Sequence, residues 1–156
     1  MKNTPRFVLI LLTLPFLFSC VDDETSSTAT LPEEDYKTQE IEINYDNFEN
    51  KIDLKDSFVL YVYSPQCGLC IQFASVITEG TEDLNFTVYE LQRNLVTEDS
   101  PLHQYAKFTP AVIIYSSGKA IANLDSTKDS DNVYFETVGG FKQWITCHVV
   151  FPLKST

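Results

Sequence analysis

The fold is decided by one stretch in the middle of the chain, Phe58-Val59-Leu60-Tyr61-Val62-Tyr63-Ser64-Pro65-Gln66-Cys67-Gly68-Leu69-Cys70. Its first half is a nearly continuous run of β-branched and aromatic residues, which is typical of a central strand buried on both faces. Ser64-Pro65 ends that run, and from Ile71 onward the apolar residues recur at helical spacing. The stretch therefore predicts a buried strand, a short turn and a helix that we expect to end at Gly80.

The two cysteines of this stretch lie at the expected start of the helix. Two intervening residues place both sulfurs on its first turn, close enough to bond. Unpaired N–H groups and the positive end of the helix dipole stabilise an anion there, and the thiolate is the nucleophilic form of cysteine. We therefore assign Cys67 as the attacking sulfur and Cys70, one turn deeper, as the resolving sulfur that breaks a mixed disulfide.

The rest of the chain alternates between strand and helix patterns. Short helices are expected after Asp46 and at Ser100-Pro101, where proline takes its favoured first position. A closing helix is expected from Gly139-Gly140. Further strands are expected at 41–45, 86–91, 111–115 and 120–124. The first three strands can lie parallel, and the last two form an antiparallel hairpin. The sequence therefore predicts an α/β fold, a mixed sheet with helices on both faces.

Two separate segments together resemble the thioredoxin family. Residues 58–73 are similar to that family's active-site strand, loop and helix, and Thr109-Pro110 with the apolar strand after it is similar to the family's second landmark. The resemblance covers about residues 41–150. It implies a thioredoxin-like three-layer α/β/α fold with a central mixed sheet of about five strands.

The resemblance also assigns a substrate surface. In thioredoxins the proline is cis and lies against the cysteine pair, so the Thr109 backbone is expected to pair with an extended substrate segment beside the disulfide. Thr109, Pro110, Gln66, Gly68 and Leu69 are the expected substrate-binding residues. We expect no cofactor and no metal ion.

Three positions depart from the family pattern. Gln66 stands where thioredoxins usually carry Trp, and Gly68-Leu69 replaces the usual Gly-Pro. Tyr61 replaces a buried Asp that assists proton transfer at the resolving cysteine, and a tyrosine is no base near neutral pH. Either resolution is slower, or another group such as Glu90 helps. The direction of electron flow stays open between reductant, oxidant and isomerase.

The N-terminal region predicts export. Lys2 and Arg6 precede an apolar run at residues 7–18, which is too short to span a bilayer but suits a signal peptide. Leu17-Phe18-Ser19-Cys20 resembles a bacterial lipobox, in which the cysteine after the cleavage site carries the lipid. We expect a signal peptide at 1–19, a lipidated Cys20 with a disordered acidic tether at 20–40, a thioredoxin-like domain at 41–150 and a tail at 151–156. The predicted location is the bacterial cell envelope, anchored to a membrane on its extracytoplasmic face.

Composition limits the partners. The formal charge is −11, with 22 acidic and 11 basic residues. This balance argues against nucleic acid and against electrostatic docking on an anionic membrane surface. The expected partners are exported protein thiols or disulfides and a membrane or extracytoplasmic redox partner, and the expected state is a monomer.

Two alternatives to a redox enzyme remain open. In the first, the protein is a non-catalytic binding module and Cys67–Cys70 is a static disulfide, which can persist outside the cytoplasm. In the second, the pair binds zinc with help from Cys147, His148 and His103. The zinc reading fits poorly, because a structural site needs a second chelating pair and adjacent side chains diverge on a helix. Cys147 is expected to be a buried helix residue.

Overall fold

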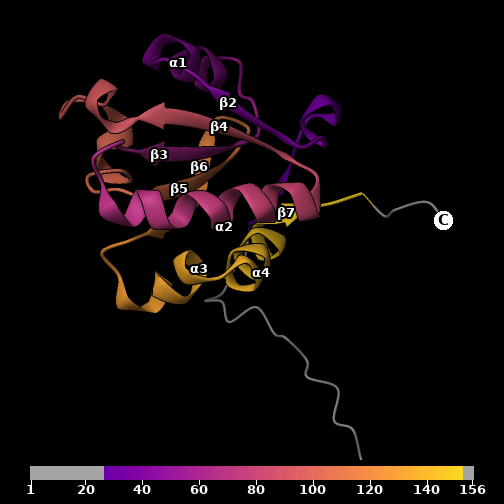
Figure 1. Ribbon diagram of the computed structural model, residues 1–156. Helices are drawn as coiled ribbons and strands as arrows, with labels where there is room; N and C mark the ends of the chain where they lie inside the picture. The colour runs from indigo at the N-terminus through magenta and orange to yellow at the C-terminus, as the bar shows by residue number, and fades with distance from the viewer. Residues whose placement is uncertain (1–26, 153–156) are drawn as a thin grey trace, which may run out of the picture.

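A five-stranded mixed sheet organises residues 27–152, the part of the chain that the computed structural model describes (Figure 1). The central strand is β3, Phe58–Tyr63, whose first five residues are buried. It pairs in parallel with β4, Thr87–Gln92, and antiparallel with β5, Ala111–Ser116. The outer strands are β2, Gln39–Glu42, which is parallel to β4, and β6, Lys119–Asp125, which forms the hairpin with β5. The expected α/β/α architecture is confirmed.

Helices cover both faces of the sheet (Figure 1). On one face lie α2, Gly68–Leu84, α3, Asn132–Glu136, and α4, Val138–His148. The other face carries α1, Tyr45–Asp53. The pleat of β3 divides the core accordingly, because successive side chains point to opposite faces. The side chains of Val59 and Tyr61 pack with α2. Those of Phe58, Leu60 and Val62 pack on the α1 side.

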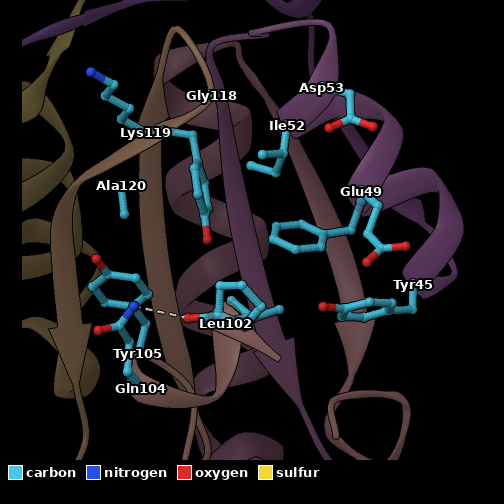
Figure 2. A pocket seen from close by; sticks show the side chains of 13 residues that line it. Tyr45, Glu49, Ile52, Asp53, Leu102, Gln104, Tyr105, Gly118, Lys119 and Ala120 are labelled. Atoms are coloured by element: carbon cyan, nitrogen blue, oxygen red, sulfur yellow. Dashed lines mark hydrogen bonds between the residues drawn. The ribbon is translucent and has the colours of Figure 1, made fainter. Parts of the chain in front are cut away.

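The helix expected at Ser100-Pro101 is a single 3-10 turn, Pro101–Gln104, in which the Ser100 hydroxyl accepts from the Leu102 N–H. So short an element covers only part of the sheet face that it shares with α1. A cavity of about 550 Å³ lies between them, lined among others by Tyr45, Tyr105 and Tyr115 (Figure 2). Two further 3-10 turns, Arg93–Leu95 and Asp129–Asp131, lie in connections between the longer elements.

The disorder expected for residues 20–40 is wrong from Ala29 onward. β1, Ala29–Thr30, pairs in parallel with β7, Val149–Val150, and a 3-10 turn follows at Glu33–Asp35. Leu31 is buried, and the buried Asp35 accepts a hydrogen bond of 2.8 Å from the Tyr89 hydroxyl. This segment is ordered by individual contacts with the domain. It presents no regular amphipathic face to the core, so its sequence shows no apolar periodicity.

The C-terminal half differs from expectation at two helix boundaries. α2 does not end at Gly80 but continues to Leu84, where Asn85 takes the left-handed conformation at φ 58°. α3, Asn132–Glu136, is a helix that the sequence did not predict, between β6 and the closing helix. The expected start of the closing helix at Gly139-Gly140 is confirmed within a residue or two, since Thr137 caps α4 by accepting from the Gly140 N–H. None of the helices within residues 27–152 is long and apolar enough to cross a membrane.

Gly80 sets the distance between α2 and α4. A Cβ added there would lie 2.5 Å from Cδ1 of Phe141, which is fully buried. The absence of a side chain at this position lets the aromatic ring of α4 pack directly on the α2 backbone.

We expect Gly80→Ala to lower the free energy of unfolding by about 1–3 kcal/mol, because overpacking at a filled contact outweighs the gain in helix propensity. Gly139→Ala is the matched control, since no atom lies within 4 Å of the added Cβ. It should be neutral or stabilising by up to about 1 kcal/mol. Chemical denaturation of both variants measures the difference, and equal effects would contradict the packing role of Gly80.

Candidate active site

Cys67 occupies the N-cap of α2. Its backbone is extended, with φ −83° and ψ 116°, and its Sγ accepts a hydrogen bond of 3.1 Å from the Cys70 N–H. An N-cap side chain that accepts from the third following amide is the arrangement that serine or aspartate adopts at helix starts. Here the acceptor is sulfur, and the helix terminus favours its anionic form.

The second landmark segment lies against this sulfur. The Thr109–Pro110 peptide bond is cis, as expected, and Pro110 is buried. The Cys67 Sγ donates to the Thr109 carbonyl oxygen at 3.3 Å, although the two residues are 42 positions apart in sequence. The structure therefore brings together Cys67, Cys70, Thr109 and Pro110, and both cysteines are free thiols.

The two sulfurs differ in exposure and in pKa. Burial alone opposes ionisation of Cys67, but hydrogen bonds with the Cys70 side chain, with Thr109 and with the amides of Cys70 and Leu69 outweigh it and lower the pKa of the Cys67 thiol. Cys70 is 4% exposed; burial and the hydrogen bond with Cys67 raise the pKa of its thiol. This asymmetry is what an attacking and a resolving cysteine require.

The surface around Cys67 is open and partly apolar. Gln66 and Gly68 are exposed, and Leu69 is 54% exposed. Phe108, which precedes Thr109, is 58% exposed. The exposed position of Phe108 could not be predicted, because nothing in a sequence distinguishes an aromatic residue that stays on the surface from one that enters the core.

A cavity of about 460 Å³ extends this surface beside the cis-proline. Leu69 and Pro110 form one side of it, while Gln72 on α2 and Phe135 and Glu136 on α3 contribute the others. The lining therefore includes α3, a helix that the sequence did not predict.

A smaller cavity of about 260 Å³ lies on the other side of the cysteine pair, lined by Cys70, Tyr61, Glu90 and neighbouring residues. Tyr61, at the position of the family's buried acid, is 4% exposed, and burial and the neighbouring Cys70 thiol both raise the pKa of its hydroxyl. Burial, together with the carboxylates of Glu40 and Glu42, raises the pKa of Glu90 to about 7. Tyr61 is therefore neutral at physiological pH, and Glu90 titrates close to it.

The histidines do not extend the site. The ring of His103 bonds the Arg93 guanidinium at 3.2 Å, and His148 packs against Trp144 at the end of α4. Cys147 is half-buried on α4. Within residues 27–152, no group of three or more His, Cys, Asp and Glu side chains is arranged to hold a metal ion. Cys20, the expected lipidation site, lies outside the described residues.

Comparison with known families agrees with this geometry. The model of the thioredoxin family matches residues 39–135, more than half of the chain. The chain therefore belongs to the thioredoxin family. No curated protein matches it.

Solved structures share the fold at low sequence identity. A crystal structure of reduced Schistosoma mansoni thioredoxin pre-protein superposes with a TM-score of 0.50 at 14% identity, covering 69% of this chain and 96% of that one. The J-Trx1 fragment of ERdj5 gives a TM-score of 0.51 at 15% identity, covering 69% of this chain and 48% of the fragment. At such identities the likeness shows the fold alone.

Replacing Glu90 by glutamine should stabilise the fold near neutral pH. The folded-state pKa of Glu90 is raised from 4.5 to about 7, so the native state binds more protons than the unfolded state between these values. The wild type should therefore lose stability as pH rises through this interval, relative to Glu90→Gln, and the two should converge below about pH 4.5. Urea denaturation at several pH values measures this, and a difference that does not vary with pH would contradict it.

Proposed function

We propose that this protein is a thiol–disulfide oxidoreductase that acts on exported protein thiols or disulfides through Cys67 and Cys70. The observation that carries the proposal is the position of Cys67, at a helix N-cap, half-exposed and in contact with the carbonyl that precedes a cis-proline. The lowered pKa of Cys67 and the raised pKa of Cys70 support the division of labour between them.

In the reductive direction, the Cys67 thiolate attacks one sulfur of a substrate disulfide. A bond forms between Cys67 and that sulfur, and the other substrate sulfur leaves as a thiolate. Cys70 then loses its proton and attacks Cys67 Sγ, so that the Cys67–Cys70 disulfide forms and the second substrate sulfur leaves. The substrate gains two electrons and the enzyme dithiol loses them. The oxidative direction is the reverse, and the geometry serves both.

The surface around the cysteines supports a polypeptide substrate. Thr109 presents backbone beside Cys67, and Leu69 and Phe108 add exposed apolar area on either side. An extended segment bound along Thr109 would place its sulfur against Cys67 and its neighbouring side chains on Gln66, Gly68 and Leu69. Such a surface holds the reacting sulfurs in line, which is the main contribution a protein makes to this exchange.

We also propose that the domain is tethered to a membrane by lipid on Cys20, on the extracytoplasmic side of a bacterial cell envelope. The support is the apolar run at residues 7–18 that ends at Ser19-Cys20. In the described part, the chain joins the domain at Ala29, so about eight residues, 21–28, would separate the lipid from β1. That length would hold the site near the bilayer surface, where a membrane-bound redox partner could reach it.

Cys67→Ser should abolish reduction of insulin disulfides, whereas Cys70→Ala should leave Cys67 in stable mixed disulfides that mass spectrometry identifies in cells. In the wild type, Cys67 should react with iodoacetamide at a pH well below the ordinary thiol pKa of about 8.5. Turnover retained by Cys67→Ser would be incompatible with the proposal. A Cys67–Cys70 reduction potential below about −300 mV would instead favour the static disulfide of a binding module.

Expression of the full chain in a bacterium tests the anchor. The wild type should partition into the detergent phase after cloud-point extraction and incorporate labelled fatty acid, and Cys20→Ala should do neither. Fatty acid incorporation that persists in Cys20→Ala would place the modification elsewhere.

A further inference from the structure

Tyr61 takes the position of the family's buried acid on β3, but a carboxyl group, that of Glu90, lies beside it on β4. Tyr61 on β3 pairs in register with Glu90 on β4, and paired residues of neighbouring strands point to the same face of a sheet. Both therefore face α2, where Cys70 is located. All three residues line the cavity of about 260 Å³.

At the edge of the sheet, the nearby hydrogen-bond donors bond to Glu42 and not to Glu90. On β2, Glu42 Oε1 accepts from the Tyr63 hydroxyl at 3.3 Å and from the Gln92 amide at 2.8 Å. Glu90 is half-buried, and its carboxylate makes no side-chain hydrogen bond within residues 27–152. The carboxylate of Glu42 is thus satisfied by hydrogen bonds, whereas that of Glu90 is not.

Among residues 27–152, no positively charged side chain lines the cavity beside Glu90. The titratable groups around the cavity are Glu40 from β2, Tyr61 and Tyr63 from β3 and Cys70 from α2, with Glu42 beside them on β2. None of these is basic, and both glutamates oppose ionisation of Glu90. The chain therefore builds a carboxyl group that exchanges its proton near neutral pH at the resolving cysteine.

Resting on the proposed function, we infer that Glu90 is the proton acceptor for Cys70, and that the Tyr61 hydroxyl and the adjoining cavity carry the proton between them. Tyr61 lines the same cavity as Cys70 and Glu90, and both of these groups act on its hydroxyl electrostatically. The cavity has room for several water molecules, each of which takes about 30 Å³. Because the transfer passes along hydrogen bonds, Tyr61 need not ionise.

In the mixed disulfide, the Cys70 thiol gives its proton through Tyr61 to the Glu90 carboxylate and becomes a thiolate. That thiolate attacks Cys67 Sγ, the Cys67–substrate bond breaks, and the substrate leaves as a thiolate that recovers a proton from Glu90 or solvent. Glu90 is therefore required for resolution and not for the first attack. In the oxidative direction it returns the same proton to Cys70.

A coloured aromatic disulfide reagent, mixed with reduced protein in equal amount, separates the two steps. Attack by Cys67 releases one coloured thiol, and attack by Cys70 on the resulting mixed disulfide releases a second. In the wild type, the second phase should quicken as pH rises through about 7. In Glu90→Gln it should be about 100-fold slower above this pH, the lower end of the usual contribution of a general base, and the first phase should change little.

Two further variants distinguish proton transfer from a structural effect. Glu90→Asp keeps a carboxylate and should restore part of the second phase. Glu42→Gln removes a neighbouring negative charge, so the midpoint of the second phase should move to lower pH while its plateau is retained. Infrared spectroscopy of the wild type should show a protonated carboxyl band that disappears near pH 7 and is missing in Glu90→Gln.

The outcomes separate this inference from the proposed function. If no first phase occurs, Cys67 is not the attacking thiol and the proposed function fails. If both phases occur and Glu90→Gln resolves at the wild-type rate with the wild-type pH profile, only the role of Glu90 is overturned. Circular dichroism checks that each variant is folded. Glu90→Gln should fold at least as well as the wild type near neutral pH, because it removes a half-buried carboxyl group that can ionise.

Discussion

The burial of β3 on both faces is the constraint on which the rest of the structure depends. A strand with no solvent-facing side must be covered by helices above and below, and its ends must leave the core in sharp turns. At its carboxyl end, Ser64-Pro65 directs the chain away from the sheet, and α2 begins two residues after Gln66. Cys67 is therefore held at the mouth of a helix whose other end is fixed against α4 through Gly80 and Phe141.

The same strand brings the distant parts of the site together. Antiparallel pairing with β5 places Ala111 opposite Val62, so the residues just before β5 arrive beside the end of β3. Parallel pairing with β4 places Glu90 opposite Tyr61. One strand thus aligns the cis-proline with Cys67 on one side and a carboxyl group with Cys70 on the other. The reacting sulfurs lie between an apolar, exposed surface and an acidic, half-buried cavity.

Three glutamates gather at the edge of the sheet, on β2 and β4. Glu40 and Glu42 are exposed on β2 and Glu90 is half-buried on the adjacent β4, so burial of Glu90 and the two neighbouring carboxylates together oppose its ionisation. Glu42 accepts hydrogen bonds from Tyr63 and Gln92, whereas the pKa of Glu90 is raised by burial and by its acidic neighbours. A carboxyl group that destabilises the fold near neutral pH is the kind of feature expected where a site needs a base of matched pKa.

Much of the fold could be predicted because its signals are local. The continuous apolar run of residues 58–63, the helical spacing after Cys70 and the proline at 110 each constrain the backbone within a few residues. The failures fall where order comes from remote contacts. Residues 29–38 are held by β7 and by Tyr89, and α2 passes through Gly80, where Asp83 of the added turn pairs with Lys142 of α4 at 2.6 Å. No pattern within those segments reports such contacts.

The sequence by itself determined which atoms could react. The cysteine pair that follows the buried strand lies at the start of a helix, and a helix N-terminus stabilises the thiolate wherever it occurs. Only the tertiary structure decided which groups surround those atoms. The contact of Thr109 with Cys67, the open position of Phe108 and the cavity shared by Cys70, Tyr61 and Glu90 all arise from strand pairing between segments far apart in the chain. The physical reason is that pKa and access depend on burial and on neighbouring charge, and both are properties of the packed molecule.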